Sequence, residues 1–244
     1  MKKLVLILND VPEVGKSSFA RVFEQFMSRK KIEYLSVSTA ETSLGHPTHW
    51  NLEDELEVGH LISFLDQSDV TVIDVASGDG GTLAEFFNEE EVFELLLEME
   101  AELTLVIPAP NHVGISDEVV AIGEAFADNA DYLIVRTPVD FDDADDSSWK
   151  GSYGEKVMDY MGAHVIEAPA MDVTMLNEIE DSYETGLALA LGDRSDLPRY
   201  LRDSLHKWEL EFSQSLAGAP ELFIPATIES KSVYGSSLDS LSQA

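Results

Sequence analysis

The residues most suggestive of chemistry follow the first apolar run, where Gly15, Lys16 and Ser17 open a stretch with helical spacing. A Gly-Lys-Ser sequence between a strand and a helix is the context of a phosphate-binding loop. Gly15 lets the backbone approach the phosphates, and the helix N-terminus supplies N–H donors. We expect Lys16 to reach the β- and γ-phosphates of ATP and Ser17 to ligate Mg²⁺. Val14 and Ser18 complete the predicted nucleotide-binding loop.

The same loop departs from the complete phosphate-loop pattern, which has Gly where this chain has Asp10. A carboxylate at this position adds negative charge beside a polyphosphate, unless the side chain turns away to cap the loop. The alternative interpretation is a chance Gly-Lys-Ser at a helix start, where Gly and Ser are common. The strand before the loop and the helix directly after it favour the phosphate loop.

A second element with chemical potential is the apolar strand that ends in Asp74 and continues into a glycine-rich turn at residues 78–81. An acid at the end of a buried strand beside a phosphate loop orients Mg²⁺, usually through water. Gly78 is expected to donate its N–H to the γ-phosphate. The alternative is an N-cap-like Asp before a flexible turn.

The elements that position these residues alternate along the chain. Short runs rich in Val, Ile and Leu are typical of strands buried on both faces of a parallel sheet. They cover residues 4–8, 34–37, 70–75, 103–108, 132–135 and 164–167. Segments with helical spacing lie between them, including a very acidic one around residues 86–97. The pattern predicts an α/β fold with a doubly wound, mostly parallel sheet flanked by helices.

The composition narrows the class of protein. Among 244 residues there are 47 acidic and 15 basic ones, which gives a formal net charge of −32. Such a surface repels nucleic acid and anionic lipid, so direct nucleic-acid binding is not expected. Cysteine is absent, which excludes disulfides and thiol catalysis. The first apolar run is too short for a signal peptide, and no run is long enough to span a membrane, so we expect a cytoplasmic protein.

The C-terminal part differs from the rest. We expect an α/β domain over residues 1–191, a C-terminal helix over 192–218 that packs on it or extends it, and a Ser-rich tail over 219–244. The helix carries Arg199, Arg202 and Lys207, a large share of the scarce basic residues. We predict that a protein partner binds in this region.

Two further groups of residues are weaker candidates. His46 and His49 have a spacing that suits a metal, but Pro47 disfavours a helix and no third ligand is evident, so a surface loop is favoured. The acidic run at residues 140–146 lacks the Gly and the final Glu of a calcium loop and is interpreted as a solvated acidic loop.

Taken together, the strand, the loop with Gly-Lys-Ser, the later Ile-Asp strand end and the parallel pattern resemble the ParA/MinD-type P-loop NTPases. The wider class includes dethiobiotin synthetase and the cobyrinic acid synthases. The resemblance implies an ATPase that acts as a nucleotide-dependent switch on a protein partner. It also implies that Thr137 and Pro169, which follow later strands, flank the nucleotide base. The absence of an Asn-Lys-x-Asp motif after the fifth strand favours ATP over GTP.

The chain also departs from this family. Val11 stands where ParA-type proteins carry a lysine that reaches the phosphates of a dimer partner. A homodimer is still possible, but it would lack that lysine bridge. The paired aspartates that follow the second strand fall in residues 38–41, where only Glu41 can replace the residue that orients the attacking water. Two alternatives therefore remain: a degenerate, non-hydrolysing interaction protein of the same fold, and an ATP-dependent ligase similar to dethiobiotin synthetase.

Overall fold

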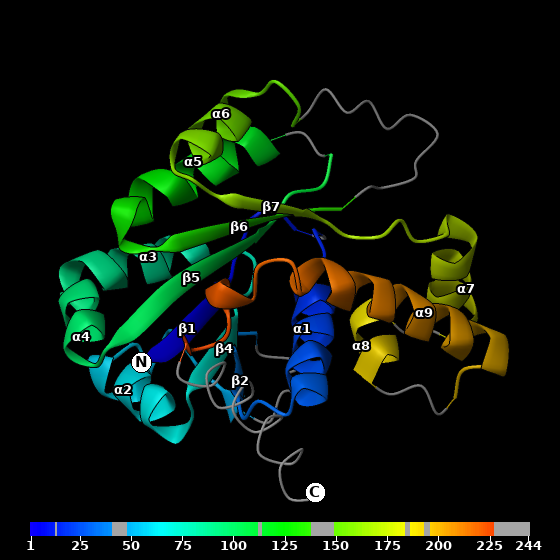
Figure 1. The fold of residues 1–244 in the computed structure, drawn as a ribbon, viewed down its shortest axis with the longest axis horizontal. Helices are drawn as coiled ribbons and strands as arrows, with labels where there is room; N and C mark the ends of the chain where they lie inside the picture. The colour runs from blue at the N-terminus through cyan, green and yellow to red at the C-terminus, as the bar shows by residue number, and fades with distance from the viewer. Residues whose placement is uncertain are drawn as a thin grey trace, which may run out of the picture.

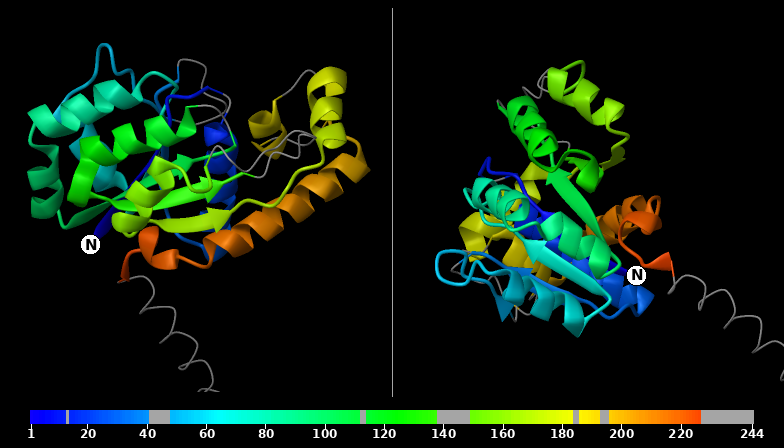
Figure 2. Two further views of the ribbon diagram at one scale, coloured as in Figure 1. Left: turned by 90° about the horizontal axis from the view of Figure 1, so that it is seen from above. Right: turned by 90° about the vertical axis from the view of Figure 1, so that its left-hand side faces the viewer.

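The chain forms a parallel sheet between two layers of helices (Figures 1 and 2). The computed structural model describes residues 1–12, 14–40, 48–111, 114–137, 149–183, 186–192 and 196–226. Over these residues the sheet has seven strands in the order β3-β2-β4-β1-β5-β6-β7, and every pair of neighbours is parallel. The strands are β1 (Lys2–Ile7), β2 (Leu35–Ser38), β3 (Thr48–His49), β4 (Val70–Asp74), β5 (Ala101–Pro108), β6 (Asp131–Arg136) and β7 (His164–Glu167). The predicted doubly wound α/β fold is confirmed.

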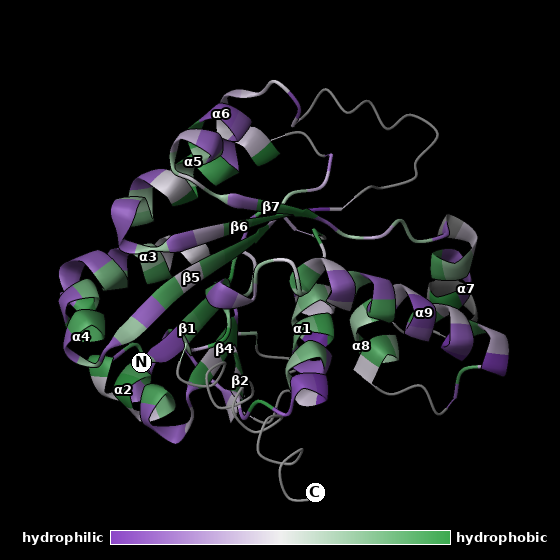
Figure 3. Cartoon of the chain, viewed as in Figure 1, coloured by the Kyte–Doolittle hydropathy of each residue, from purple (hydrophilic) through white to green (hydrophobic). Residues whose placement is uncertain are grey.

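The apolar residues of the central strands build two cores, one on each face of the sheet. Side chains alternate between the faces of a strand, so Leu4 and Leu6 of β1 enter one core and Val5 and Ile7 enter the other. All four side chains are fully buried. Figure 3 shows the hydrophobic colouring along the strands and mixed colouring on the outer helices, as expected for elements with one solvated face.

The helices divide between these two cores. The first core lies under α2 (Val58–Gln67), α3 (Gly80–Glu89), α4 (Val92–Glu98), α5 (Ile115–Phe126) and α6 (Tyr153–Tyr160). The second lies under α1 (Lys16–Lys30), α7 (Val173–Tyr183), α8 (Leu187–Gly192) and α9 (Arg199–Leu216). Short 3₁₀ turns occur at η1 (Ala127–Asn129) and η3 (Pro220–Leu222). Within the described residues no helix is both long and apolar enough to cross a bilayer.

Three local predictions differ from the structure. The acidic segment around residues 86–97 is two helices, because Glu91 adopts a left-handed conformation with φ 53° between them. The run at 164–167 does form a strand, but β7 is an edge strand with Val165 56% exposed, so burial on both faces was wrong there. The short strand β3 was not predicted, since two residues carry too little pattern, and it contains His49.

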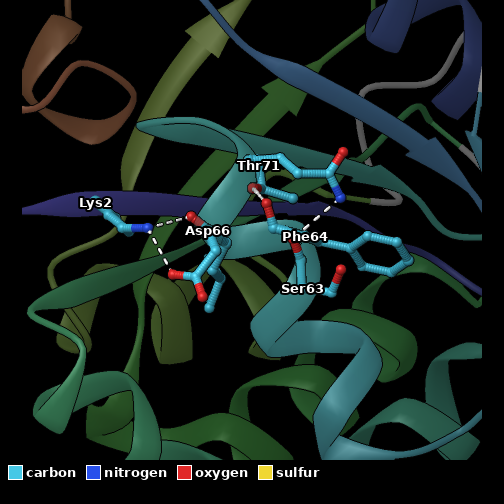
Figure 4. Close-up of polar contacts among 7 residues, drawn as sticks. Lys2, Ser63, Phe64, Asp66 and Thr71 are labelled. Carbon is cyan, nitrogen blue, oxygen red and sulfur yellow. Dashed lines mark hydrogen bonds and ion pairs between the residues drawn. The ribbon is translucent and has the colours of Figure 1, made fainter.

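Polar contacts fix the C-terminal end of α2 to the sheet (Figure 4). The Lys2 ammonium donates to the carbonyl of Leu65 and, at 3.2 Å, to the carboxylate of Asp66. The Thr71 hydroxyl donates to the carbonyl of Phe64 at 3.3 Å. Helix C-termini leave carbonyls without partners and attract cations. These contacts therefore anchor α2 to the start of β1 and β4, the two strands whose opposite ends carry the candidate site.

The C-terminal helix α9 packs against α1 and contributes to the second core. The guanidinium of Arg29 on α1 pairs with the fully buried carboxylate of Glu209 on α9 and donates to the Ser213 hydroxyl at 2.9 Å. After α9, the Thr104 hydroxyl on β5 donates to the carbonyl of Leu222 at 2.6 Å, and Phe223 is fully buried. Four residues of the predicted tail, Ala219, Leu222, Phe223 and Ile224, are thus buried, whereas residues 227–244 lie outside the described ones.

We expect Arg29→Ala to lower the free energy of unfolding by about 3 kcal/mol, because the buried Glu209 carboxylate loses its guanidinium. The control is Arg199→Ala, since the Arg199 side chain is 87% exposed and pairs with Asp203 at 3.5 Å within the same helix. That change should stay within about 0.5 kcal/mol. Urea denaturation measures both, and equal losses would contradict the assigned role of Arg29.

Candidate functional site

The candidate site lies where the central strands β1 and β4 end side by side. In their parallel pairing Ile7 is opposite Asp74, so the loop after β1 and the turn after β4 leave the same edge of the sheet. The carboxyl ends of parallel strands are the usual place for a binding crevice. The structure thereby brings Lys16, at the start of α1, next to Ser77 and Gly78, in the turn that follows Asp74.

The loop between β1 and α1 is shaped by Asn9 and Gly15. The buried Asn9 amide donates to the carbonyl of Pro108 at 2.7 Å, and its oxygen accepts from the N–H of Val11 at 2.9 Å. Gly15 has φ +90°, a left-handed conformation that glycine adopts without strain, and it immediately precedes α1. Our sequence interpretation missed the role of Asn9, although an Asn-Asp pair after a strand is a known turn signal.

Lys16 is the central group of the site. Its side chain is 8% exposed, and its ammonium donates to the carbonyl of Asn9 at 2.5 Å and to the hydroxyl of Ser77 at 2.7 Å. Burial lowers the pKa of Lys16 below its usual range, and nearby carboxylates oppose this effect. These carboxylates belong to Asp74, Asp10, Glu118 and Asp79. Among the described residues, none of them forms an ion pair with Lys16.

The carboxylate of Asp10 turns away from its own loop and binds the neighbouring turn. One oxygen accepts from the N–H of Gly78 at 2.9 Å and from the N–H of Gly80 at 3.0 Å. The N–H of Asp10 itself donates to the carboxylate of Glu118 on α5 at 2.8 Å. Asp10 thus caps the start of α3, where Asp79 stands at the N-cap position without using its side chain for capping.

A threonine links the end of β2 to the same turn. The Thr39 hydroxyl accepts from the N–H of Ala76 at 2.8 Å and donates to the carboxylate of Asp79 at 2.5 Å. The N–H of Thr39 donates to the carbonyl of Asp74 at 3.1 Å. Thr39 lies in the segment where the family resemblance implies paired aspartates. This chain therefore has a threonine hydroxyl there in place of a carboxylate. The Asp74 side chain is 5% exposed, at the end of β4.

The remaining predicted residues are distributed as follows. Ser17 and Ser18 are half-buried in the first turn of α1, and within the described part of the chain no hydrogen bond engages either hydroxyl. Thr137 follows β6, and its buried hydroxyl has no hydrogen-bond partner among the described residues. The carbonyl of Pro169, after β7, accepts from the indole N–H of Trp208 at 2.7 Å.

Several predictions fall on residues that the structure does not describe. These are Glu41 as the residue that orients water, His46 as part of the histidine pair, and the acidic run at 140–146. Among the residues that are described, no three His, Asp or Glu side chains are grouped so that they could hold a metal ion.

The strand order, the loop between β1 and α1 and the acid at the end of β4 define a P-loop NTPase type of fold. No family model and no curated protein matches the sequence. Solved structures with a similar course of the chain include the MinD cell division protein of Aquifex aeolicus, at 13% identity and a TM-score of 0.48 over 88% of this chain and 97% of that one.

Two further structures are similar over most of this chain. The McdA–ATP complex of Cyanothece has 12% identity and a TM-score of 0.46, over 88% of this chain and 96% of that one. The signal recognition particle 54 kDa protein of Aeropyrum pernix in complex with GDP has 17% identity and a TM-score of 0.43. The similar region comprises 91% of this chain and 51% of that protein. At such identities and TM-scores these likenesses assign no function.

We expect Lys16→Met to raise the free energy of unfolding of the ligand-free protein by about 1 kcal/mol, because it removes a buried charge that has no carboxylate within ion-pair distance in the described part of the chain. A lowered pKa means that the folded state binds fewer protons than the unfolded state between the two pKa values. The free energy of unfolding of the wild type should therefore rise relative to that of the variant as pH rises through the lowered pKa of Lys16. Urea denaturation at several pH values measures this difference. A wild type that becomes less stable relative to Lys16→Met as pH rises would contradict the lowered pKa of Lys16.

Proposed function

We propose that this protein binds ATP with Mg²⁺ at the loop formed by Val14, Gly15, Lys16, Ser17 and Ser18, and acts as a nucleotide-dependent switch on a protein partner. The observation that carries this proposal is the environment of Lys16. Among the described residues this buried ammonium donates to neutral oxygens, those of Asn9 and Ser77, and burying a cation with such partners is costly. A phosphate oxygen placed on the ammonium would return the electrostatic stabilisation that burial removes, because charge-assisted hydrogen bonds are about twice as strong as neutral ones.

The residues around Lys16 fit a nucleotide and its metal. A Cβ built on Gly15 or on Gly78 would meet no atom within 4 Å, so there is free space beside both glycines for a ligand to approach the backbone. Ser17 offers a hydroxyl to Mg²⁺, and Asp74 is the acid that would orient the ion. When bound, the ion would neutralise phosphate charge in a strongly acidic neighbourhood. Thr137 and Pro169 follow adjacent strands on the same edge and remain the proposed contacts of the base.

The link from nucleotide to partner runs along α1. This helix begins at Lys16 and packs on α9, with the rings of Phe19 and Phe212 5.5 Å apart and Arg29 paired with Glu209. A change in the position of Lys16 would therefore be transmitted through α1 to α9, the helix that we propose as part of the partner surface. Two of the basic residues of α9 pair with acids one turn further along the helix, Arg199 with Asp203 at 3.5 Å and Lys207 with Glu211 at 3.7 Å.

A second candidate function is that of a degenerate interaction protein that keeps this fold without hydrolysis. It is favoured by the contacts that already occupy the site, because Lys16 and Asp10 both bind the turn at residues 77–80. The ligase alternative has less support. Arg21, one of its few basic candidates for a substrate pocket, pairs with Glu24 at 2.8 Å on its own helix.

Calorimetric titration with ADP and with ATP in the presence of Mg²⁺ tests the proposed function. We expect Lys16→Met to weaken binding by about tenfold to a hundredfold, the range for one hydrogen bond to a charged group. Lys30→Met is the matched control, because Lys30 lies in the last turn of the same helix, is exposed, and should bind as the wild type does. Equal affinity in wild type and Lys16→Met would sink the assignment, and no binding at all would favour the interaction protein.

A further inference from the structure

The turn after β4 contains an anion site that the chain itself fills. The N–H groups of Gly78 and Gly80 converge on one carboxylate oxygen of Asp10, at 2.9 and 3.0 Å. Convergent backbone N–H groups in a turn bind anions, and here they lie at the start of α3, where the helix dipole adds to the attraction. The residue just before them, Ser77, binds the Lys16 ammonium. The Asp10 carboxylate is therefore placed next to the cation proposed to hold the phosphates.

The contact between Asp10 and the turn depends on glycine at position 80. A Cβ built on Gly80 would lie 2.9 and 3.0 Å from the two carboxylate oxygens of Asp10, so the carboxylate would have to shift from its present position. The backbone of Gly80 needs no left-handed conformation, so its role here is to admit the carboxylate. A Cβ on the adjacent Gly81 would meet no atom within 4 Å.

We infer that Asp10 acts as an internal substitute for a terminal phosphate and makes the resting site selective for a nucleoside diphosphate over a triphosphate. This inference rests on the proposed function and on the expectation from the sequence that the Gly78 N–H donates to the γ-phosphate. A diphosphate can bind to Lys16 and the loop while Asp10 keeps both N–H groups. A triphosphate has to displace the carboxylate, because one donor site cannot serve two anions and like charges at this distance repel.

Displacement of the Asp10 carboxylate would also change the structure of the site between the diphosphate and triphosphate states. In the resting protein the turn at residues 77–80 is held to the phosphate loop by Lys16 and by Asp10. A terminal phosphate would take over the N–H groups of the turn and leave the Asp10 side chain to move. The difference between the diphosphate and triphosphate states is then the position of this carboxylate, a local exchange of anions at a two-state element.

Two variants break the contact in independent ways, and each has a matched control. Asp10→Asn keeps the shape and removes the charge, with Asp79→Asn as the control that removes one charge from the same turn without touching the two N–H groups. Gly80→Ala keeps the charge and forces the carboxylate to shift away from the added methyl group, with Gly81→Ala as the control one residue further along. Affinities for ADP and ATP with Mg²⁺ are measured by calorimetry on the wild type and all four variants.

We expect the wild type to bind ADP about tenfold or more tightly than ATP, as befits the loss of a charge-assisted contact. Asp10→Asn and Gly80→Ala should each raise ATP affinity by about tenfold and change ADP affinity by less than about threefold, while both controls keep the wild-type ratio. ATP binding as tight as ADP binding in the wild type would overturn the inference, as would an equal shift of the ratio in either control. Absence of binding of either nucleotide in every protein overturns the proposed function, and this inference with it.

Discussion

The structure of the candidate site depends on the burial of one ammonium group. Lys16 stands where the loop after β1, the turn after β4 and the first turn of α1 meet, and its two hydrogen bonds join all three. The cost of desolvating this cation is seen in its lowered pKa. Nearby carboxylates offset part of this cost, and the desolvation that remains is what the proposed phosphate contact would relieve.

Around Lys16, the loops at the carboxyl edge are held by side chains that serve the backbone of another segment. Asn9 binds the end of β5, Asp10 binds the start of α3, and Thr39 binds the turn after β4. Each contact satisfies a backbone group that would otherwise need water. Several such contacts act together, so the geometry of the edge is fixed before any ligand arrives and a ligand has to replace existing bonds.

Much of the fold could be predicted from the sequence, because its signals are local. Runs of Val, Ile and Leu gave the six longer strands, and the placement of Gly15, Lys16 and Ser17 after the first of them located the loop. The predictions failed where long-range packing decides the outcome. The backbone break at Glu91, the exposed edge at β7 and the burial of Phe223 depend on neighbours that no local pattern contains. Likewise, the sequence showed that Asp10 was unusual but not that its carboxylate would bind Gly78 and Gly80.

The acidic surroundings of the site follow from the same physics as its lysine. Asp10 and Asp74 lie near the ammonium without ion-pairing with it in the described structure, and Glu118 is bound to the backbone of Asp10. A polyphosphate entering this neighbourhood meets strong repulsion unless a divalent cation accompanies it, because only the cation can offset several negative charges at once. Dependence of phosphate binding on Mg²⁺ is therefore part of the proposed function. In the proposed function, one additional phosphate charge would act against binding at Asp10, whose carboxylate already occupies the N–H groups of Gly78 and Gly80.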